Sequence, residues 1–364
     1  MDHHPRLIAA LLAAVVAAPL AVGGCDIQHG DPASSCSGKT TLRASGSSAQ
    51  AIAIDRFTAA YEDHCPGYAL DYRSTGSAVG IAEFTSGKTD FGGTDSPLTP
   101  SDAEWEDAVA RCGGSEPWNL PLVFGPIAVT YNVFGVSRMI LDGPTIAKIF
   151  TGRIRSWNAP EIAALNPDQP LTQQPIVVIH RGDESGTTDN FQRYLQAAAG
   201  TAWDRGAGKV FRGGIGKPRD GNAGAAAAVA STPGSVTYTE WSFAQQQELP
   251  AAQIITPAGP DPVALSFESA SASLNGVRLR DRGNDLILDI SSLYVPTRLG
   301  AYPIVLVSYE VVCSRYPDRS TAAAVARFLS IALTSGQGGL GDLGYVPVPA
   351  WLRDRLMGAI DQLG

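Results

Sequence analysis

The feature that most constrains the fold of this chain is a regular alternation of strand-like and helix-like segments that begins near Lys39. Residues 40–45 have a strand pattern, residues 49–63 have the periodicity of an amphipathic helix, and residues 68–74 again have a strand pattern. A helix between two strands returns the chain so that the strands run parallel. The alternation therefore predicts an α/β protein with a largely parallel, doubly wound sheet that helices cover on both faces.

Two long β-rich runs divide the alternation into blocks. The first covers residues 120–133 and is interrupted by Gly125-Pro126, and the second covers residues 300–312. A second α/β block lies between the runs, so we expect each run to carry the chain from one lobe to the other. The sequence thus predicts two doubly wound α/β lobes joined by a two-strand hinge, with a cleft between them. The expected boundaries are 39–126 plus 304–364 for lobe I and 127–303 for lobe II.

Residues 1–24 have the pattern of a signal peptide. Their apolar run, residues 7–22, is too short and too rich in small residues for a membrane span. It closes on Val22-Gly23-Gly24-Cys25, which resembles a bacterial lipobox, so we expect cleavage before Cys25 and acylation of its thiol. Two or three acyl chains would hold the protein on the extracytoplasmic face of the cell membrane, with residues 25–38 as a polar tether. The alternative is an ordinary secretory signal followed by an incidental cysteine.

The four other cysteines are Cys36, Cys65, Cys112 and Cys313. An even number in an exported protein indicates disulfides, and four cysteines allow three connectivities. Cys36 precedes the first predicted strand, and Cys65 ends the helix that returns from the far end of that strand. Both should lie at one edge of the sheet, which favours the pairs Cys36–Cys65 and Cys112–Cys313. No pair has the short spacing of zinc ligands, so no metal site is predicted.

Four polar turns each follow a strand and stand at or near the start of a helix. They are residues 44–49, 74–78, 92–97 and 181–188. In an α/β sheet such turns lie at the carboxyl ends of the strands, where ligands bind. A helix start exposes unpaired N–H groups at the positive end of the helix dipole, so it favours an anion. Hydroxyl donors stand in these turns at Ser48, Ser77, Ser185 and Thr187.

Arg181 distinguishes this set of turns from ordinary helix caps. Ser and Thr at a helix start are usually N-caps, and capping explains any one of the turns taken alone. Capping does not require an arginine, whereas a planar guanidinium matches the oxygens of phosphate or carboxylate. Three turns from lobe I and one arginine-bearing turn from lobe II therefore predict an anion-binding cleft.

Two aspartates in the turns narrow the choice of anion. Asp95 would be out of place beside a fully ionised oxyanion, but phosphate at neutral pH keeps at least one proton, which a carboxylate can accept. Sulfate has no such proton, so its oxygen would face the carboxylate unpaired and repelled. A carboxylate among donors thus selects phosphate over sulfate, while Asp183 is expected to pair with Arg181 and hold its guanidinium in place.

Other classes of protein fit the sequence less well. The formal net charge is −8 and no basic stripe is present, which argues against a nucleic-acid partner. A serine hydrolase built on Ser185 is the alternative of a different class. Its turn, Gly-Asp-Glu-Ser-Gly, does not fit the G-x-S-x-G elbow, and His180 precedes Arg181 on a strand and should point to the opposite face. We therefore expect a binding protein without a cofactor, and not an enzyme.

Five segments together resemble the phosphate-binding lipoprotein of the bacterial high-affinity phosphate ABC importer. They are ASGSSAQA, STGSAVGI, TDFGGTDSPL, LDGPTIAKIFTGRIRSWNAPEIAALNP and RGDESGTTDNF, in that order, and the resemblance covers roughly residues 39–364. It implies a type II periplasmic-binding-protein fold, a monomer that closes about its hinge on inorganic phosphate, and delivery to the membrane permease subunits. The phosphate contacts that it implies are Ser48, the Ala49 amide, Ser77, Asp95, Arg181, Ser185, the Gly186 amide and Thr187.

Two residues depart from the pattern of that family. Glu184 stands where the family usually has glycine, and we expect its side chain to point away from the cleft. Ala49 stands where many members have phenylalanine, which leaves the backbone amide as a donor. Two alternatives remain on the same fold: a binding protein for another oxyanion such as sulfate or molybdate, against which Asp95 argues, and a relative that senses phosphate or acts as an adhesin.

Overall fold

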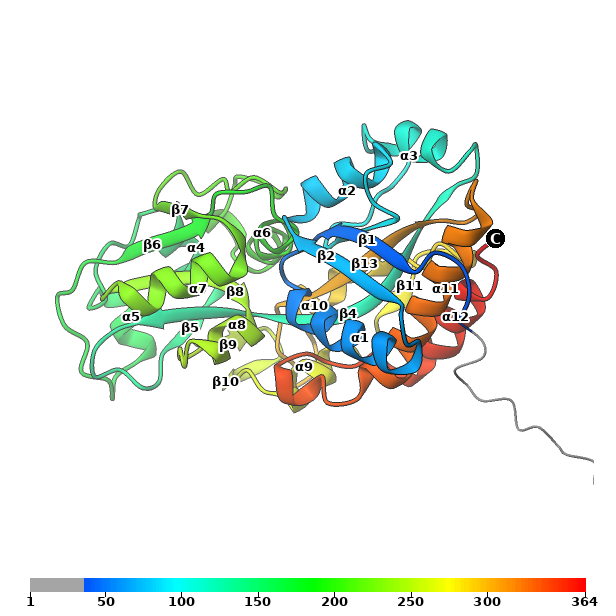
Figure 1. The fold of residues 1–364 in the computed structure, drawn as a ribbon. Coiled ribbons are helices and arrows are strands. Elements are labelled where there is room, and N and C mark those ends of the chain that lie inside the picture. The colour runs from blue at the N-terminus through cyan, green and yellow to red at the C-terminus, as the bar shows by residue number, and fades with distance from the viewer. Residues whose placement is uncertain (1–35) are drawn as a thin grey trace, which may run out of the picture.

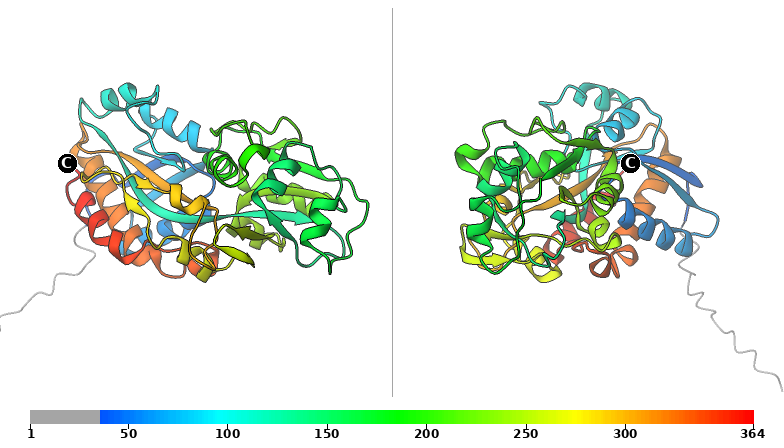
Figure 2. Two further views of the ribbon diagram at one scale, coloured as in Figure 1. Left: turned by 180° about the vertical axis from the view of Figure 1, so that it is seen from behind. Right: turned by 90° about the vertical axis from the view of Figure 1, so that its left-hand side faces the viewer.

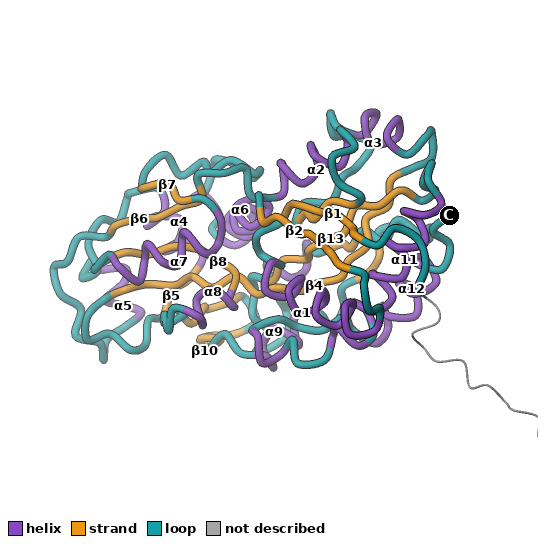
Figure 3. Tube along the Cα trace, viewed as in Figure 1, coloured by secondary structure: helices purple, strands orange, loops and turns teal. Residues whose placement is uncertain are grey.

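The computed structural model describes residues 36–364, which form two lobes side by side (Figure 1). Both lobes are built of strands covered by helices, as the tube drawing makes plain (Figure 3). The expected signal peptide, Cys25 and most of the tether lie in residues 1–35, outside the described residues. No described helix is both long enough and apolar enough to cross a membrane.

The first part of lobe I follows the predicted alternation of strands and helices. Its elements are β1 (Thr41–Gly46), α1 (Ala51–His64), β2 (Ala69–Ser74), α2 (Ser77–Thr85), β3 (Phe91–Thr94) and α3 (Trp105–Arg111). Helix α2 packs directly on the sheet because glycines meet at the contact, where a Cβ on Gly80 would lie 2.5 Å from the Cα of Gly46. This close packing brings the turn before α2 next to the turn after β1.

The chain then crosses to lobe II along β4 (Pro117–Asn132) and alternates again. The elements of lobe II are β5 (Ile140–Asp142), α4 (Gly143–Phe150), α5 (Pro160–Leu165), β6 (Val177–Arg181), α6 (Gly186–Ala198), β7 (Lys217–Arg219), α7 (Gly221–Ser231), β8 (Ser235–Glu240), α8 (Trp241–Gln246), β9 (Gln253–Thr256) and β10 (Gly259–Val263). The remaining elements are α9 (Phe267–Ser273), β11 (Arg278–Leu279), β12 (Leu288–Asp289), α10 (Ser291–Tyr294), β13 (Val305–Cys313), α11 (Arg319–Leu333) and α12 (Ala350–Ile360).

One eight-stranded sheet runs through both lobes in the order β2-β1-β3-β13-β4-β8-β6-β7. Strands β1, β2 and β3 pair in parallel at one end, and β6, β7 and β8 pair in parallel at the other. The central strands β13 and β4 are antiparallel to their neighbours. The parallel pairing predicted from the alternation therefore holds within each lobe, and the antiparallel pairs belong to the crossing strands.

Strand β4 belongs to both lobes. Its first part, from Pro117 to Pro126, pairs with β13, and its second part, from Ile127 to Asn132, pairs with β8. The change of partner falls directly after Gly125-Pro126, where a Cβ on Gly125 would lie 2.9 Å from the Cγ of Glu240. The backbone N–H of Ile127 also donates to the carbonyl of Ile304 at 2.8 Å, so the two crossings lie side by side.

The segment from Arg280 to Ser291 packs against lobe I, although the sequence placed residues 127–303 in lobe II. Asp285 Oδ1 accepts hydrogen bonds from the backbone N–H and the Nδ2 of Asn119 at 2.6 and 2.9 Å. Arg355 in α12 donates to the carbonyl of Arg282 at 2.9 Å, and Figure 2 shows this yellow segment among the elements of lobe I. We therefore propose that lobe II ends before this segment and not at residue 303.

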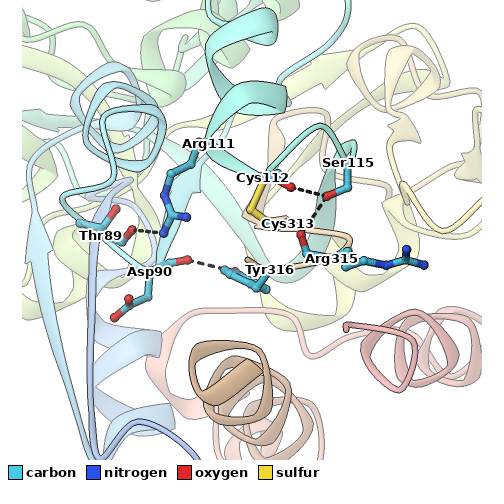
Figure 4. The surroundings of a disulfide bond; sticks show 8 residues. All are labelled: Thr89, Asp90, Arg111, Cys112, Ser115, Cys313, Arg315 and Tyr316. Atoms are coloured by element: carbon cyan, nitrogen blue, oxygen red, sulfur yellow. Dashed lines mark hydrogen bonds between the residues drawn. A yellow bond between two sulfur atoms is a disulfide. The ribbon is translucent and has the colours of Figure 1, made fainter. Parts of the chain in front are cut away.

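The two disulfides join Cys36 to Cys65 and Cys112 to Cys313, which is the connectivity that the sequence favoured. Cys112 is the C-cap of α3 and Cys313 ends β13, so the second bridge ties residues 201 positions apart at the outer edge of lobe I (Figure 4). Beside it, Ser115 Oγ lies 2.8 Å from the carbonyl oxygens of both Cys112 and Arg315 and can donate its one proton to either. This cluster stabilises the end of β13 that lies away from lobe II.

Candidate functional site

The four polar turns meet where the two lobes face each other. The turns after β1, β2 and β3 come from lobe I, and the turn between β6 and α6 comes from lobe II. Helix α6 lies at the junction of the lobes in Figure 1, with its first turn against lobe I. The parallel strands of each lobe therefore bring their carboxyl ends to a common seam, as the position of such turns in α/β sheets requires.

Asp95 is the central acid on the lobe I side. Its side chain is buried, and its Oδ1 accepts hydrogen bonds from the hydroxyls of Ser47 at 2.5 Å and Ser308 at 2.6 Å. Its Oδ2 has only the Ser77 hydroxyl, at 3.5 Å, as a partner among the described residues. Burial raises the pKa of Asp95 above its ordinary value, against the hydrogen bonds from Ser308 and Ser47. One carboxylate oxygen is thus saturated, while the other is held only loosely.

Arg181 is the central cation on the lobe II side, and its side chain is 1% exposed. Its Nε donates to Asp183 Oδ1 at 2.7 Å and its Nη2 donates to Asp183 Oδ2, which is the pairing that we expected. Burial acts to raise the pKa of Asp183, but the Arg181 guanidinium outweighs it, so this pKa lies below its ordinary value. The paired carboxylate leaves Nη1 of Arg181 directed at the Thr187 hydroxyl, 3.4 Å away.

The start of α6 provides the direct contact between the lobes. Ser185 is the N-cap, and its Oγ accepts from the backbone N–H of Thr188 at 3.2 Å. The backbone N–H of Gly186, the first residue of α6, donates to Ser77 Oγ in lobe I at 3.1 Å. A Cβ on Gly186 would lie 2.5 Å from Ser77 Oγ and 2.6 Å from Asp95 Cβ. The lobes therefore meet closely at the site, and only glycine permits this approach.

Further contacts across the seam hold the lobes together beside these turns. Asn190 Nδ2 donates to the backbone carbonyl of Asp95 at 2.8 Å, and Ser96 Oγ donates to Asp189 Oδ2 at 2.7 Å. Asp189 also accepts from Arg193 at 3.0 Å. A cavity of about 400 Å³ adjoins Asp95 along this part of the seam. The described structure is thus a closed form whose tightest contacts are at the polar turns.

The structure brings together all the residues predicted for the site, with two differences in detail. Ser48, Ser77, Asp95, Arg181, Ser185, Gly186 and Thr187 are all buried at the seam. The Ala49 amide is not free in this form, because it donates to Ser47 Oγ at 3.1 Å inside its own turn. Ser185 serves as a helix cap because its oxygen accepts one hydrogen bond, and its hydroxyl proton remains for a ligand. Glu184 is exposed, as we expected.

Sequence reasoning missed Asn222, which is fully buried at the start of α7. Its backbone N–H and its Nδ2 both donate to Ser48 Oγ across the seam, at 3.2 and 3.0 Å. The preceding residue, Gly221, donates its N–H to Asp183 Oδ1 at 3.1 Å. The signal that could have found this turn is Asp-Gly-Asn between a strand and a helix, but β7 spans only three residues and the surrounding glycine-rich stretch was assigned no chemistry.

The geometry does not support the serine hydrolase alternative. His180, the histidine nearest in sequence to Ser185, stacks on the ring of Phe211 at 4.4 Å between ring centroids. His64 bonds to the carbonyl of Ala60 and to Ser335 Oγ, in another part of lobe I. Within residues 36–364 neither histidine reaches a serine of the site, and no group of three metal-ligating side chains is found. The site therefore contains donors and charges, but no pair of nucleophile and base.

Comparison with known proteins identifies the class. A family model described as a PBP superfamily domain matches residues 31–331. The fold resembles a phosphate-binding protein from Stenotrophomonas maltophilia, with a TM-score of 0.64 and 18% identity over 88% of this chain and 94% of that one. A putative phosphate ABC transporter substrate-binding protein from Clostridium perfringens gives a TM-score of 0.59 and 17% identity over 85% of this chain and 100% of that one. The protein is a two-lobed α/β solute-binding protein of the periplasmic-binding-protein type.

Relatives with higher identity narrow the class to a family. The chain is 52% identical to the phosphate-binding protein PstS 3 of Mycobacterium tuberculosis, over 94% of this chain and 91% of the relative. It is 50% identical to PstS 2 of the same species, over 90% and 88%, and 30% identical to PstS of Methanocaldococcus jannaschii, over 92% and 90%. The chain belongs to the PstS family of phosphate-binding proteins, which are binding subunits of transporters and not enzymes.

Proposed function

We propose that this protein captures inorganic phosphate, as HPO₄²⁻ or H₂PO₄⁻, between its closing lobes and presents it to the permease of a phosphate ABC importer. The proposed contacts are the predicted set: Ser48, Ala49, Ser77, Asp95, Arg181, Ser185, Gly186 and Thr187. Hinge closure about β4 and β13 would bring the donors of both lobes around the anion. Each charge-assisted hydrogen bond contributes roughly 1.5–3 kcal/mol, so several together give tight binding.

The observation that carries this proposal is the unequal use of the two oxygens of Asp95. Ser47 and Ser308 saturate Oδ1, whereas Oδ2 has a single long contact within residues 36–364 and lies beside the donors of the site. An oxygen that needs a donor, in a site that attracts anions, fits an anion with a proton of its own. Phosphate carries such a proton at neutral pH and sulfate does not, so the same geometry argues against the alternative of a sulfate or molybdate receptor.

Calorimetry on the protein from residue 26 onward tests the proposal. The chain is stripped of ligand by unfolding and refolding with its disulfides intact, and phosphate is then titrated with and without a large excess of sulfate. We expect tight phosphate binding that sulfate does not change. Absence of any heat with phosphate would refute the proposal, and competition by sulfate would favour the receptor for another oxyanion.

We also propose that the mature protein is a monomer anchored through acylated Cys25 on the extracytoplasmic face of the cell membrane. The lipobox-like sequence before Cys25 supports the lipid anchor. In cells that express the full chain, Cys25→Ala should move the protein from the membrane fraction to the soluble fraction. A variant that stays membrane-bound would contradict the lipid anchor and leave the binding proposal untouched.

A further inference from the structure

Asn222 lies at the point where α7 of lobe II meets the turn after β1 of lobe I. Its side chain has no exposed surface. It is preceded by Gly221, whose φ of +68° is a left-handed conformation that favours glycine. This turn places the backbone N–H and the side-chain amide of Asn222 side by side, so that both reach Ser48 Oγ, at 3.2 and 3.0 Å. No other described residue donates to Ser48 Oγ.

The orientation of the Asn222 amide follows from its other partners. Its oxygen, Oδ1, lies 2.9 Å from the backbone N–H of Glu240 and 3.1 Å from the hydroxyl of Thr239. A backbone N–H can only donate, so the atom that faces it must be the amide oxygen. Nδ2 therefore points the opposite way, toward Ser48 Oγ at 3.0 Å and Thr187 Oγ1 at 3.2 Å. Asn222 can act on these two hydroxyls only as a donor.

This orientation determines the role that the two hydroxyls can play. A hydroxyl has two acceptor lone pairs and one proton. Ser48 Oγ accepts two bonds from Asn222, and Thr187 Oγ1 accepts from Asn222 at 3.2 Å and from Arg181 Nη1 at 3.4 Å. Both lone pairs of each oxygen are therefore occupied, and neither proton has an acceptor among the described residues. The remaining capacity of each hydroxyl is to donate, which suits an anion.

We propose that Asn222 is a positioning residue that fixes the hydroxyls of Ser48 and Thr187 as hydrogen-bond donors toward the bound anion. It reaches Ser48 only in the closed form, because Ser48 belongs to lobe I and Asn222 to lobe II, whereas its contact with Thr187 lies within lobe II. The inference rests on the proposed function, since it needs an anion at this site. It adds a residue that touches no ligand and yet contributes to affinity and to the preference for an anion.

Two substitutions at this position separate the proposed role from simple packing. Asn222→Ala removes the donor and frees the hydroxyls to rotate, which should weaken phosphate binding by about tenfold, the equivalent of one weakened hydrogen bond. Asn222→Asp keeps the shape of the side chain but replaces the donor with an acceptor. The hydroxyls would then turn their protons to the carboxylate and away from the anion, and the new charge would repel it. We expect roughly a further hundredfold loss.

The decisive result is which of the two variants binds inorganic phosphate more weakly, as measured by calorimetry. A residue that only fills space would tolerate the isosteric aspartate better than alanine, so binding by Asn222→Asp equal to or tighter than binding by Asn222→Ala would overturn the inference. The gap should also narrow as the pH falls from 8 toward the ordinary pKa of an aspartate, about 4, because a protonated carboxyl can donate again. Comparison of the two variants at each pH cancels the protonation of phosphate itself, and a constant gap would contradict the proposal.

Controls keep the test decisive. Asn132→Asp makes the same change elsewhere in lobe II, where Nδ2 donates to the carbonyls of Val229 and Ala230, and it should leave phosphate affinity unchanged. If Asn222→Asp does not fold, a double-mutant cycle of Asn222→Ala with Ser48→Ala replaces it. Additive losses in that cycle would refute the link to Ser48. Failure of the wild-type protein to bind phosphate would instead refute the proposed function.

Discussion

The two halves of the site each contain an aspartate, buried in lobe I and 17% exposed in lobe II, but they use it in opposite ways. In lobe II, Asp183 is paired through both oxygens with Arg181, and its pKa is lowered. In lobe I, the carboxylate of Asp95 accepts within the described chain only from the hydroxyls of Ser47, Ser77 and Ser308, and burial raises its pKa. The lobe II acid is therefore neutralised by a cation, and the lobe I acid is not.

This difference indicates a division of labour between the lobes. The chain carries a net charge of −8, so attraction of an anion must come from local groups, and the guanidinium and the start of α6 are both in lobe II. We propose that the acid in lobe I, which has no cation as a partner in the described chain, instead distinguishes anions that carry a proton from anions that do not. Neither half is sufficient, because a cation alone does not distinguish phosphate from sulfate and a carboxylate alone repels both.

The largest loss of affinity should follow removal of the lobe II cation. Arg181→Ala takes away the buried guanidinium and leaves the partly buried Asp183 unpaired beside the anion, and breaking a buried pair costs about 3–5 kcal/mol. We expect phosphate affinity, measured by calorimetry, to fall by roughly a hundredfold to several thousandfold.

Two further variants show which property of Arg181 accounts for that loss of affinity. Arg181→Lys keeps the charge but not the planar fork, and should fall between the wild type and Arg181→Ala. Combining Arg181→Ala with Asp183→Asn removes the orphaned carboxylate and should recover part of the affinity. If Arg181→Ala binds phosphate within about tenfold of the wild type, charge attraction does not reside in lobe II.

The next largest loss of phosphate affinity should come from preventing the two lobes from closing on each other. Gly186→Ala places a methyl group where Ser77 Oγ and Asp95 Cβ would be 2.5 and 2.6 Å away, so the closed contact cannot form. We expect about a hundredfold weaker phosphate binding, and a radius of gyration by small-angle X-ray scattering that no longer falls when phosphate is added. Gly358→Ala in α12, where a Cβ meets nothing within 4 Å, is the matched control and should close normally.

Removing the acid of lobe I should change selectivity more than affinity. Asp95→Asn keeps the shape of the side chain but no longer repels a proton-free oxygen, so phosphate affinity should fall by about tenfold while sulfate becomes a competitor. Acidification should have the same effect on the wild type. Because burial raises the pKa of Asp95, the carboxylate becomes protonated at a pH above its ordinary value of 3.8.

Competition titrations with sulfate across a range of acidic pH check both statements. Sulfate should begin to displace phosphate from the wild type as the pH falls toward the raised pKa of Asp95, whereas the Asp95→Asn variant should accept sulfate at every pH. If the wild type and the Asp95→Asn variant both exclude sulfate, Asp95 of lobe I does not discriminate between protonated and proton-free anions.

The sequence predicted one half of this comparison better than the other. The Arg181–Asp183 pair follows from two residues in one turn, and the four turns follow from strand and helix patterns that are local in the chain. The partners of Asp95 do not, because Ser308 is 213 positions away and reaches Oδ1 only through the place of β13 beside β3 in the sheet.

Other parts of the structure escaped the sequence for the same physical reason. Asn222 follows a strand of three exposed residues, whose pattern carries no burial signal. The segment from Arg280 to Ser291 joins lobe I through side-chain contacts such as Asp285 with Asn119, which no periodicity encodes. The Ala49 amide was expected to face the ligand, but its N–H donates a hydrogen bond to the Ser47 hydroxyl oxygen in the same turn. Patterns locate elements, whereas tertiary contacts decide which oxygen and which N–H remain free.

The smallest loss of phosphate affinity should follow removal of the Asp183 carboxylate. This acid is expected to act through Arg181 alone, so its variant tests the difference between the two lobes. Asp183→Asn keeps an oxygen for the Gly221 N–H but holds the guanidinium of Arg181 less firmly. Phosphate affinity should therefore fall by about tenfold or less, and sulfate should still not bind.

Because the folded pKa of Asp183 is lowered, its ionised form stabilises the fold above the ordinary pKa of 3.8, and this contribution is lost as the pH falls through the lower folded pKa. The variant should therefore unfold more easily than the wild type in denaturant at pH 7, by about 1–2 kcal/mol, and the difference should shrink below about pH 4. Binding of sulfate by the Asp183→Asn variant would mean that the acid of lobe II also discriminates between phosphate and sulfate. The proposed difference in role between the two lobes would then be wrong.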